Sequence, residues 1–473
     1  MGAGVSDWKL ARSVSVQGAL GVVSGTALDI ILVRRLEQGD VDGNMRRALA
    51  AFPDQSVADR IIKTWYRSDG TSETHDFSNV PPRRLDNKPE TAKMLDEIAV
   101  ASNFVEIWLA KEGHDNPVGI NYLEKIQLPN APSIYGAMLA GVDYIFMGAG
   151  IPLEVPGIID AYSRGEGATF QIHIEGAAKD EITQGVFDPR TVIASPPATL
   201  KRPFFVSIVS SFILAVTMLT RASGKVDGLI VEHHTAGGHN APPRGVLQLD
   251  NKGEPMYGPK DTVDYAKIIG LNVPFWLGGS FSKKESLSET ISQGAQGIQV
   301  GTLFAFCRES GLMPTLKRKF LETVRAGTAI VFTHPSASPT GYPFKLGVLD
   351  GTLSESEVYK KRTPLCNMGY LRELFKTPEG TIGYRCSAEN KKAYVKKGGK
   401  LERTDEARCL CNALLANIGL GMKYASSYLE EPLLTVGTHL ESLKELIQQV
   451  GLDYSSKDVI LFLKSKGTVG AKI

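Results

Sequence analysis

The sequence predicts an α/β fold in which parallel strands and helices alternate and form a (β/α)8 barrel. Seven short apolar runs each end in glycine or a small polar residue, which is typical of strands buried on both faces. Helical stretches separate these runs, and a short Gly-Val-Asp-like phrase precedes several of them. A doubly wound open sheet is the structural alternative. The seven expected strands are residues 20–26, 118–123, 144–148, 204–209, 228–232, 273–279 and 297–302.

The connections and the start of the chain complete this prediction. Residues 132–140 and 283–294 are the clearest expected helices, and each leads into the next strand through a glycine-containing phrase. A closed barrel needs eight strands. The chain opens on Met1-Gly2-Ala3-Gly4, which is typical of a loop that follows a strand. We therefore expect the first strand to be absent from this sequence, and a misplaced start codon would explain its absence.

Two parts of the chain fall outside the strand–helix repeat. Residues 35–115 are rich in charge and proline, with an expected helix around residues 90–111. After about residue 330 the strand pattern stops, and a turn-rich segment leads to two short amphipathic helices at 440–450 and 456–466. We expect two domains: a barrel over residues 1–330 with an insertion at about 35–115, and a cysteine-containing extension with a small helical appendage over residues 331–473.

Composition excludes several classes of partner. The 473 residues include 53 basic and 51 acidic side chains, a net charge of +2, and no long run of one sign. Neither a nucleic acid nor a membrane surface is therefore expected as a partner. No apolar stretch reaches the ~18 residues that a membrane span needs. The 5 cysteines are too few for a disulfide framework and no signal pattern is present, so a reducing cytoplasm is the expected location.

Two glycine turns lie where a barrel commonly binds phosphate. Gly278-Gly279-Ser280 follows the seventh strand position of a complete barrel, and Gly301-Thr302 follows the eighth. The loops at these two positions often hold a phosphate, because bare backbone allows N–H groups to approach an anion closely. Each turn leads towards a helix. The two turns together predict a phosphate-binding site.

The segment after the strand at 228–232 is rich in histidine. It contains His233, His234 and His239, three of the chain's 8 histidines, and the Gly237-Gly238 pair. A histidine here could act as a general acid or base, or could hydrogen-bond a ligand. Metal binding is a second reading, although the helical spacing of zinc proteases is missing. A third reading is a polar loop whose histidines cap backbone groups. It suits His239 least, because the glycine pair brings that residue across the barrel mouth.

Five motifs, in order along residues 1–310, carry a family resemblance. They are GVVSGTAL (21–28), GINYLEK (119–125), HHTAGGHNAPPRG (233–245), WLGGSF (276–281) and GAQGIQVGTLFAFCRES (294–310). Together they resemble the nitronate monooxygenases, formerly called 2-nitropropane dioxygenases. The AGGH and GAxGxQxGTxF patterns are shared with the FMN-dependent enoyl-acyl-carrier-protein reductases, including those of polyunsaturated fatty acid synthases.

The resemblance implies a TIM-like barrel with FMN at its carboxyl face. His239 would lie near the flavin and the substrate as the catalytic residue. The remaining implied contacts divide by position: Gly2, Ala3 and Gly4 along the flavin ring, Thr26 and Asn121 at its polar edge, Gly237 and Gly238 beside it, and Gly278, Gly279, Ser280, Gly301 and Thr302 at its phosphate.

One position departs from the family pattern. Well-known nitronate monooxygenases use a histidine in the segment after the fifth strand, where residues 214–219 here read LAVTML with Thr217 and no histidine. Threonine cannot act as a base at neutral pH, so deprotonation of a carbon acid is in doubt. A nitronate that is already ionised would not need this deprotonation. Enoyl reduction would need NAD(P)H as co-substrate, and one site can serve both substrates in turn.

Three functional hypotheses follow. The first is an FMN-dependent oxidoreductase resembling nitronate monooxygenase, in which the flavin oxidises a nitronate or similar small molecule and reacts with O2. The second is an NAD(P)H-dependent reductase of enoyl thioesters in fatty acid or polyketide synthesis. The third is a non-catalytic flavin- or metal-binding component of an assembly.

The third hypothesis depends on four cysteines in the extension: Cys366, Cys386, Cys409 and Cys411. Four cysteines in a turn-rich segment can form a site for zinc or an iron–sulfur cluster that organises the segment. The spacing lacks a CxxC pair. The alternative is that they are small buried apolar side chains, as free cysteine usually is.

Overall fold

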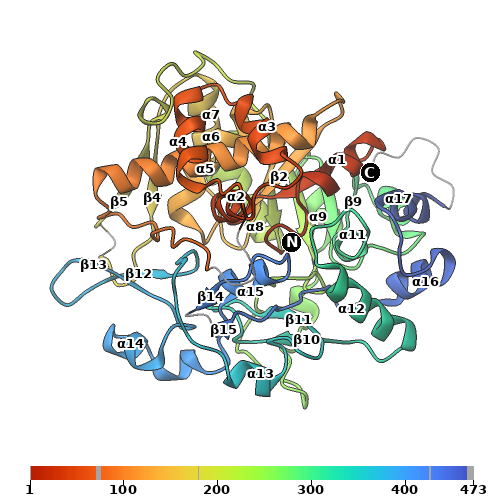
Figure 1. Ribbon diagram of the computed structural model, residues 1–473. Helices are drawn as coiled ribbons and strands as arrows, with labels where there is room; N and C mark the ends of the chain where they lie inside the picture. Colours follow the sequence, from red (N-terminus) through yellow and green to blue (C-terminus); the bar gives the residue numbers. More distant parts are fainter. Residues whose placement is uncertain (1, 71–75, 179, 425–427, 466–473) are drawn as a thin grey trace.

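Seven parallel strands form the central sheet of the computed structural model, which describes residues 2–70, 76–178, 180–424 and 428–465. Figure 1 shows the arrangement of its elements. Each strand pairs with the next one in chain order, without a reversal. This is the order of a parallel barrel, whereas a doubly wound sheet reverses direction at its switch point. The predicted barrel-type fold class is confirmed. The strands are β1 (Gly21–Ser24), β2 (Val118–Leu123), β3 (Tyr144–Gly148), β6 (Phe204–Val209), β7 (Gly228–Glu232), β8 (Phe275–Gly278) and β9 (Gly297–Gln299).

The sheet is curled around its own apolar interior. Phe146 of β3, Val206 of β6 and Ile230 of β7 form one buried cluster, against which Val22 of β1 and Trp276 of β8 pack. Side chains from five strands can meet in this way only if one face of the sheet is concave. The intervening residues of the same strands belong to a different, outer cluster.

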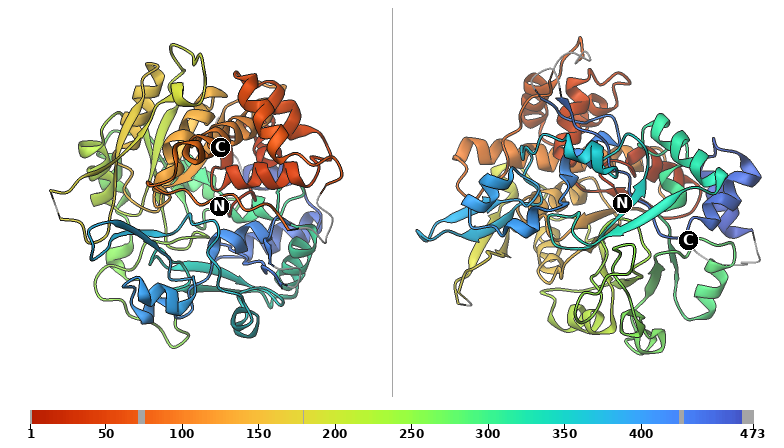
Figure 2. Two further views of the ribbon diagram at one scale, coloured as in Figure 1. Left: turned by 60° about the vertical axis from the view of Figure 1, so that its left-hand side comes forward. Right: turned by 90° about the horizontal axis from the view of Figure 1, so that it is seen from below.

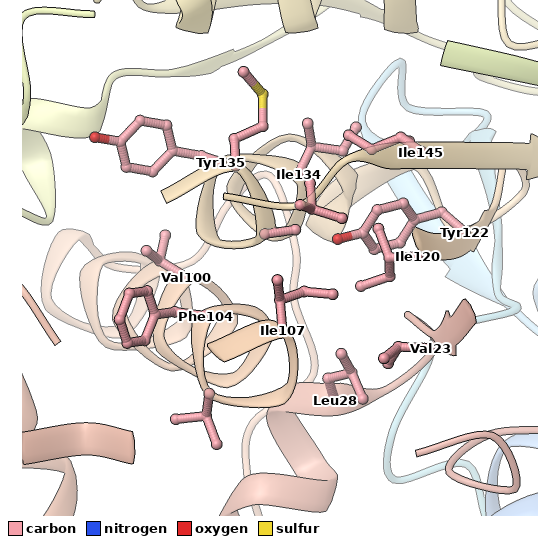
Figure 3. Packing of buried hydrophobic residues seen from close by; sticks show 14 of the residues in the cluster. Val23, Leu28, Val100, Phe104, Ile107, Ile120, Tyr122, Ile134, Tyr135 and Ile145 are labelled. Carbon is pink, nitrogen blue, oxygen red and sulfur yellow. The ribbon is translucent and has the colours of Figure 1, made fainter. Parts of the chain in front are cut away.

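Helices cover the outer face of this sheet. Ile107 of α5 (Pro89–Lys111) and Ile134 of α6 belong to the same buried cluster as Ile120 of β2 and Ile145 of β3, which Figure 3 shows from close by. The barrel helices are α1 (Trp8–Val16), α2 (Leu28–Glu37), α6 (Gln127–Leu139), α7 (Val155–Ser163), α8 (Phe212–Arg221), α9 (Tyr265–Ile269), α10 (Ser286–Ser292), α11 (Thr302–Ala305) and α12 (Pro314–Ala326); β4 (Ala168–Ile172) and β5 (Thr183–Phe187) form a hairpin between α7 and β6.

The charged and proline-rich insertion supplies part of that outer layer. It folds as α3 (Asn44–Ala50), α4 (Gln55–Trp65) and the 23-residue α5 (Pro89–Lys111). Buried charges of this insertion form ion pairs. Arg35 lies 2.7 Å from Glu106 and 3.2 Å from Asp7 of the N-terminal segment, and both carboxylates are almost fully buried.

The aspartates of the Gly-Val-Asp-like phrases hold neighbouring strands together. The carboxylate of Asp143 accepts a hydrogen bond from the N–H of Val118 at 3.0 Å, and that of Asp227 accepts one from Phe205 at 2.9 Å. Each aspartate precedes one strand and accepts a hydrogen bond from a backbone N–H at the start of the strand beside it. The recurring phrase therefore fixes the register at the amino ends of the strands.

The edge strands β1 and β9 are not paired with each other within the described residues. Near the carboxyl end of β1, the carbonyl of Ser6 accepts a hydrogen bond from Ser24 at 2.8 Å, and the carbonyl of Val5 accepts one from Gly311 at 2.9 Å. Along the outer side, α1 meets α17 (Ser456–Lys464), where the hydroxyls of Ser13 and Ser456 lie 2.7 Å apart. Residues 5 and 6 thus connect the end of β1 with the chain that follows β9, and α17 packs outside them against α1.

The segment after residue 330 lies across one side of the barrel, in teal and blue in Figures 1 and 2. The β10–β11 hairpin reaches the barrel mouth, where the N–H of Lys345 donates to the carbonyl of Gly238 at 3.0 Å. No helix of the described residues is both long and apolar enough to cross a membrane. The elements are β10 (Ile330–His334), β11 (Phe344–Val348), α13 (Ser356–Lys360), β12 (Glu373–Lys376), β13 (Ile382–Arg385), α14 (Lys391–Lys396), α15 (Leu410–Ala416), β14 (Lys423–Tyr424), β15 (Tyr428–Leu429), α16 (Glu441–Val450) and α17 (Ser456–Lys464).

Candidate active site

A cavity lies at the carboxyl ends of β1, β2, β3 and β7, beneath the extension. Its empty space is about 950 Å³, the solvent at its opening included. This is the end of a parallel barrel at which ligands bind. Leu371, Leu410 and Leu414 of the extension form part of the wall. Six of the residues predicted from the sequence also line the cavity: Ala3, Thr26, Asn121, Gly237, Gly238 and His239.

Asn121 brings an unsatisfied polar atom to this cavity. It lies near the end of β2, and its neighbour Tyr122 points the other way, donating a hydrogen bond to Asn103 in the outer layer. The Oδ1 atom of Asn121 is buried and has no hydrogen-bond partner among the described residues. Because such an atom loses the hydrogen bonds it would make in water, its position favours a bound polar ligand.

The glycine pair after β7 brings the backbone close to the cavity. At Gly237 a β-carbon would lie 2.9 Å from the carbonyl carbon of Val436, so any side chain would displace that segment. Gly238 has a φ of +84°, and its N–H donates to the hydroxyl of Thr435 at 2.8 Å. Both positions therefore require glycine for reasons visible in the structure.

His239 is held on both sides by the extension. Its Nε2 atom lies 2.7 Å from the hydroxyl of Ser338, and its ring packs edge-on against Phe344 with centroids 5.0 Å apart. Burial lowers the pKa of His239 to about 4. The imidazole is thus neutral at pH 7, where it can form hydrogen bonds but is a weak base.

Glu232 is a functional candidate that was not predicted from the sequence. It is the last residue of β7 and the sole carboxylic side chain among the described residues that line the cavity. Burial raises its pKa to about 7. A carboxyl group of this kind can take up or release a proton near neutral pH. Its position at the carboxyl end of a predicted strand was the signal that could have identified it.

The predicted phosphate turns lie beside one another but do not line the cavity. A β-carbon at Gly279 would lie 2.7 Å from the carbonyl oxygen of His233. A β-carbon at Gly301 would have no other atom within 4 Å. The hydroxyl of Thr302 accepts a hydrogen bond from the N–H of Gly437 at 2.9 Å. The Oγ atom of Ser280 is buried without a partner among the described residues. The segment around Gly437 thus lies between these turns and the cavity.

Gly2 and Gly4 likewise lie outside the cavity wall. Gly4 has a φ of +65°, and a β-carbon there would lie 2.5 Å from the side chain of Ile418, at the end of α15. Close packing against the extension therefore explains why residue 4 is glycine. Gly278 ends β8, where a β-carbon would lie 3.3 Å from Ile230.

The other predicted polar residues lie farther from the cavity. His234 stacks on Tyr257 with centroids 3.9 Å apart, and burial lowers its pKa to about 4. His233 lies 3.0 Å from the hydroxyl of Thr235. Thr217 is in α8, where its hydroxyl donates to the carbonyl of Ile213 at 2.8 Å. No described histidine other than His239 lines the cavity.

The four cysteines of the extension come together at a second, smaller cavity, which Cys366, Cys386, Cys409 and Cys411 all line. Within the described part of the chain, no three His, Cys, Asp or Glu side chains are arranged around a common point as ligands of one ion.

The fold is that of a parallel-barrel protein, and its larger cavity lies at the carboxyl ends of the strands. Among curated proteins, the chain is similar to a probable nitronate monooxygenase of Bacillus subtilis (strain 168), with 29% identity over 140 residues. This match covers 29% of the chain and 36% of the relative, so the chain aligns with about a third of the relative's length. The resemblance to this family, predicted from the motifs, is confirmed.

Solved structures similar to this chain include FabK from Thermotoga maritima, with a TM-score of 0.44 and 14% identity over 98% of this chain and 90% of that one. A nitroalkane oxidase from Streptomyces ansochromogenes has a TM-score of 0.44 and 11% identity over 98% of this chain and 93% of that one. No protein-family profile matches the chain.

Proposed function

We propose that this protein is an FMN-dependent oxidoreductase that oxidises a nitronate or a similar electron-rich small molecule and passes the electrons to O2. The observation that carries the proposal is the meeting of Asn121, Gly237, Gly238 and His239 at one cavity. These residues come from two of the family-like motifs, 119–125 and 233–245, and the family that these motifs resemble uses FMN. The similarity to a probable nitronate monooxygenase supports the same assignment.

The residues around the cavity fit a flavin. FMN, when bound, supplies a centre that accepts two electrons from one substrate and passes them to another. Asn121 offers an unpaired carbonyl oxygen to a ring N–H, and Gly237 and Gly238 leave the wall free of side chains beside it. The turns at Gly279 and Gly301 would hold the phosphate, with the Gly437 segment adjusting its contact with Thr302.

Two side chains of the cavity would handle substrate and protons. Neutral His239, positioned by Ser338, would hydrogen-bond an oxygen of the substrate through its ring. Glu232 would hold or release a proton at its carboxyl group near pH 7. This division of roles between His239 and Glu232 requires no histidine at the position of Thr217, because a nitronate is already ionised when it binds.

The apolar part of the cavity wall favours a second candidate, NAD(P)H-dependent reduction of an enoyl thioester. Ile126, Leu371, Leu410, Leu414 and Phe344 face the cavity together. Such a wall suits an acyl chain, because binding the chain there removes apolar surface of both from water, which is favourable. Protonated Glu232 would then act as the acid that completes the reduction.

One flavin-loaded sample can decide between these candidates. We expect the purified protein to be yellow and to contain FMN. Turnover of an alkyl nitronate with consumption of O2 would establish the first function, and oxidation of NAD(P)H that depends on an enoyl thioester would establish the second. A colourless protein that does not bind added FMN would exclude both.

A further inference from the structure

Four of the five cysteines gather in the extension although three separate segments supply them. Cys366 precedes β12, Cys386 follows β13, and Cys409 and Cys411 lie at the start of α15. Together with Ala388 and Ala407 they form one small buried cluster. All of them are free cysteines.

The four thiols face one small cavity, which Cys366, Cys386, Cys409 and Cys411 line together. Among the described residues, no three side chains of this cluster already surround a common point as ligands of one ion. Because each cysteine side chain has three staggered rotamers, an ion that replaced the thiol protons could draw the sulfur atoms together by rotation of the side chains.

Polar groups around the cluster are those that thiolates need. The side-chain amide of Asn412 donates to the Sγ atom of Cys409 at 3.6 Å. The guanidinium of Arg362 is buried and interacts electrostatically with Cys409. Its Nη2 atom has no hydrogen-bond partner among the described residues, although its Nε binds Glu430 at 3.0 Å. Arg362 and Asn412 would stabilise a thiolate at Cys409 in addition to their existing partners, Glu430 and Asn367.

We propose that Cys366, Cys386, Cys409 and Cys411 together bind a thiophilic metal centre. Four thiolates are the ligand set of structural zinc and of iron–sulfur clusters, and they carry a negative charge that Arg362 partly balances. Metal binding releases the thiol protons and joins segments that otherwise have little core of their own.

The metal centre would lie directly behind the barrel-mouth cavity. Cys411, Leu371 and Leu410 line both cavities. Pro339 also lines the cysteine cavity, and the preceding residue, Ser338, binds His239. A bound metal would therefore hold in place both the wall of the cavity and the contact that orients His239. This role does not depend on which substrate the barrel uses.

Metal analysis of the full-length chain tests the proposal. The protein would be produced with zinc and iron both supplied, purified without oxygen, and analysed for metals and acid-labile sulfide. About one zinc per chain without colour would indicate a zinc site. About two to four irons with matching sulfide and visible absorption would indicate an iron–sulfur cluster. Either result supports the proposal.

The fifth cysteine provides a matched control. Cys307 is fully buried in a different cluster, and burial is the main reason why its pKa is raised to about 12. The metal should be lost in Cys366→Ser and Cys409→Ser and retained in Cys307→Ser. A wild type that holds neither metal after anaerobic reconstitution overturns the proposal, as does equal metal content in all variants.

A measurement on the wild type covers the case in which the serine variants do not fold. A chelator should release the metal from the native protein and expose all four cluster thiols to a thiol reagent. If the cluster thiols react at the same rate before and after chelation, the proposal is wrong.

Discussion

The Nε2 atom of His239 lies 2.7 Å from the hydroxyl of Ser338, which is 99 residues further along the chain. Ser338 itself accepts a hydrogen bond from the N–H of Thr340 at 3.2 Å and lies 2.8 Å from that residue's hydroxyl. The histidine of the barrel mouth is therefore oriented by a turn of the extension. This contact makes the extension part of the candidate site.

We predict that Ser338→Ala lowers kcat by about tenfold while FMN content is unchanged, because the neutral imidazole loses the partner that fixes its orientation. Steady-state kinetics and flavin absorbance measure the two effects. Ser338→Thr, which keeps the hydroxyl, should restore most of the rate. Ser288→Ala in α10, whose hydroxyl binds the carbonyl of Glu285, is a control outside the site. An unchanged kcat in Ser338→Ala would show that the contact does not position His239.

The phosphate turns can be tested without steric disturbance at Gly301. This residue has an ordinary negative φ, and a β-carbon there would meet nothing within 4 Å. We predict that Gly301→Asp weakens FMN binding by about tenfold relative to the isosteric Gly301→Asn, since a like charge near a phosphate costs on the order of 1 kcal/mol. Titration with FMN followed by flavin fluorescence measures the difference. Equal affinities would place the phosphate elsewhere.

Gly279 is unsuitable for the same comparison. Its φ is +90°, and any β-carbon would collide with the carbonyl oxygen of His233. Loss of flavin from a Gly279 variant would therefore report backbone strain as well as charge.

The barrel strands were the most predictable part of the fold. The apolar runs at 118–123, 144–148, 204–209 and 228–232 coincide with β2, β3, β6 and β7. Central parallel strands are apolar on both faces, so a continuous apolar run marks each of them. The predicted strand at 297–302 was too long. Residues from Thr302 onward form α11, because the chain turns into a helix directly after the glycine.

The candidate site was predictable only for residues near strand ends. Thr26, Asn121 and His239 line the cavity because β-strands bring their carboxyl ends together. The contributions of Ser338, Leu371 and Cys411 to this site were not predictable, because the extension has no periodic pattern from which its path over the barrel could be derived. Long-range contacts of this kind depend on packing between segments far apart in the chain.

Glu232 gives a pH test that distinguishes the two proposed reactions. Burial raises its pKa to about 7, so the carboxyl group is protonated below this pH and ionised above it. If it acts as a base towards a neutral carbon-acid substrate, a step that an ionised nitronate does not require, kcat should rise through pH 7. If it acts as an acid in enoyl reduction, kcat should fall. Glu232→Gln should remove the inflection and lower kcat roughly a hundredfold, whereas exposed Glu289→Gln should change neither. A wild-type profile that is flat between pH 6 and 8 would contradict a role for Glu232.

The last prediction concerns the aspartates that hold the strands together. Burial raises the pKa of Asp227, but hydrogen bonds from Lys225, Phe205 and Arg202 outweigh this effect and lower it overall. A carboxylate with a lowered folded-state pKa stabilises the fold above its unfolded pKa of about 3.9, and this contribution is lost as the pH falls. Asp227→Asn should therefore reduce the free energy of unfolding at pH 7 by about 1–2 kcal/mol, with a smaller difference from wild type near pH 3. Urea unfolding at the two pH values measures this, with exposed Asp42→Asn as the control. An equal loss at both pH values would show that shape, and not the charge of Asp227, stabilises the strand ends.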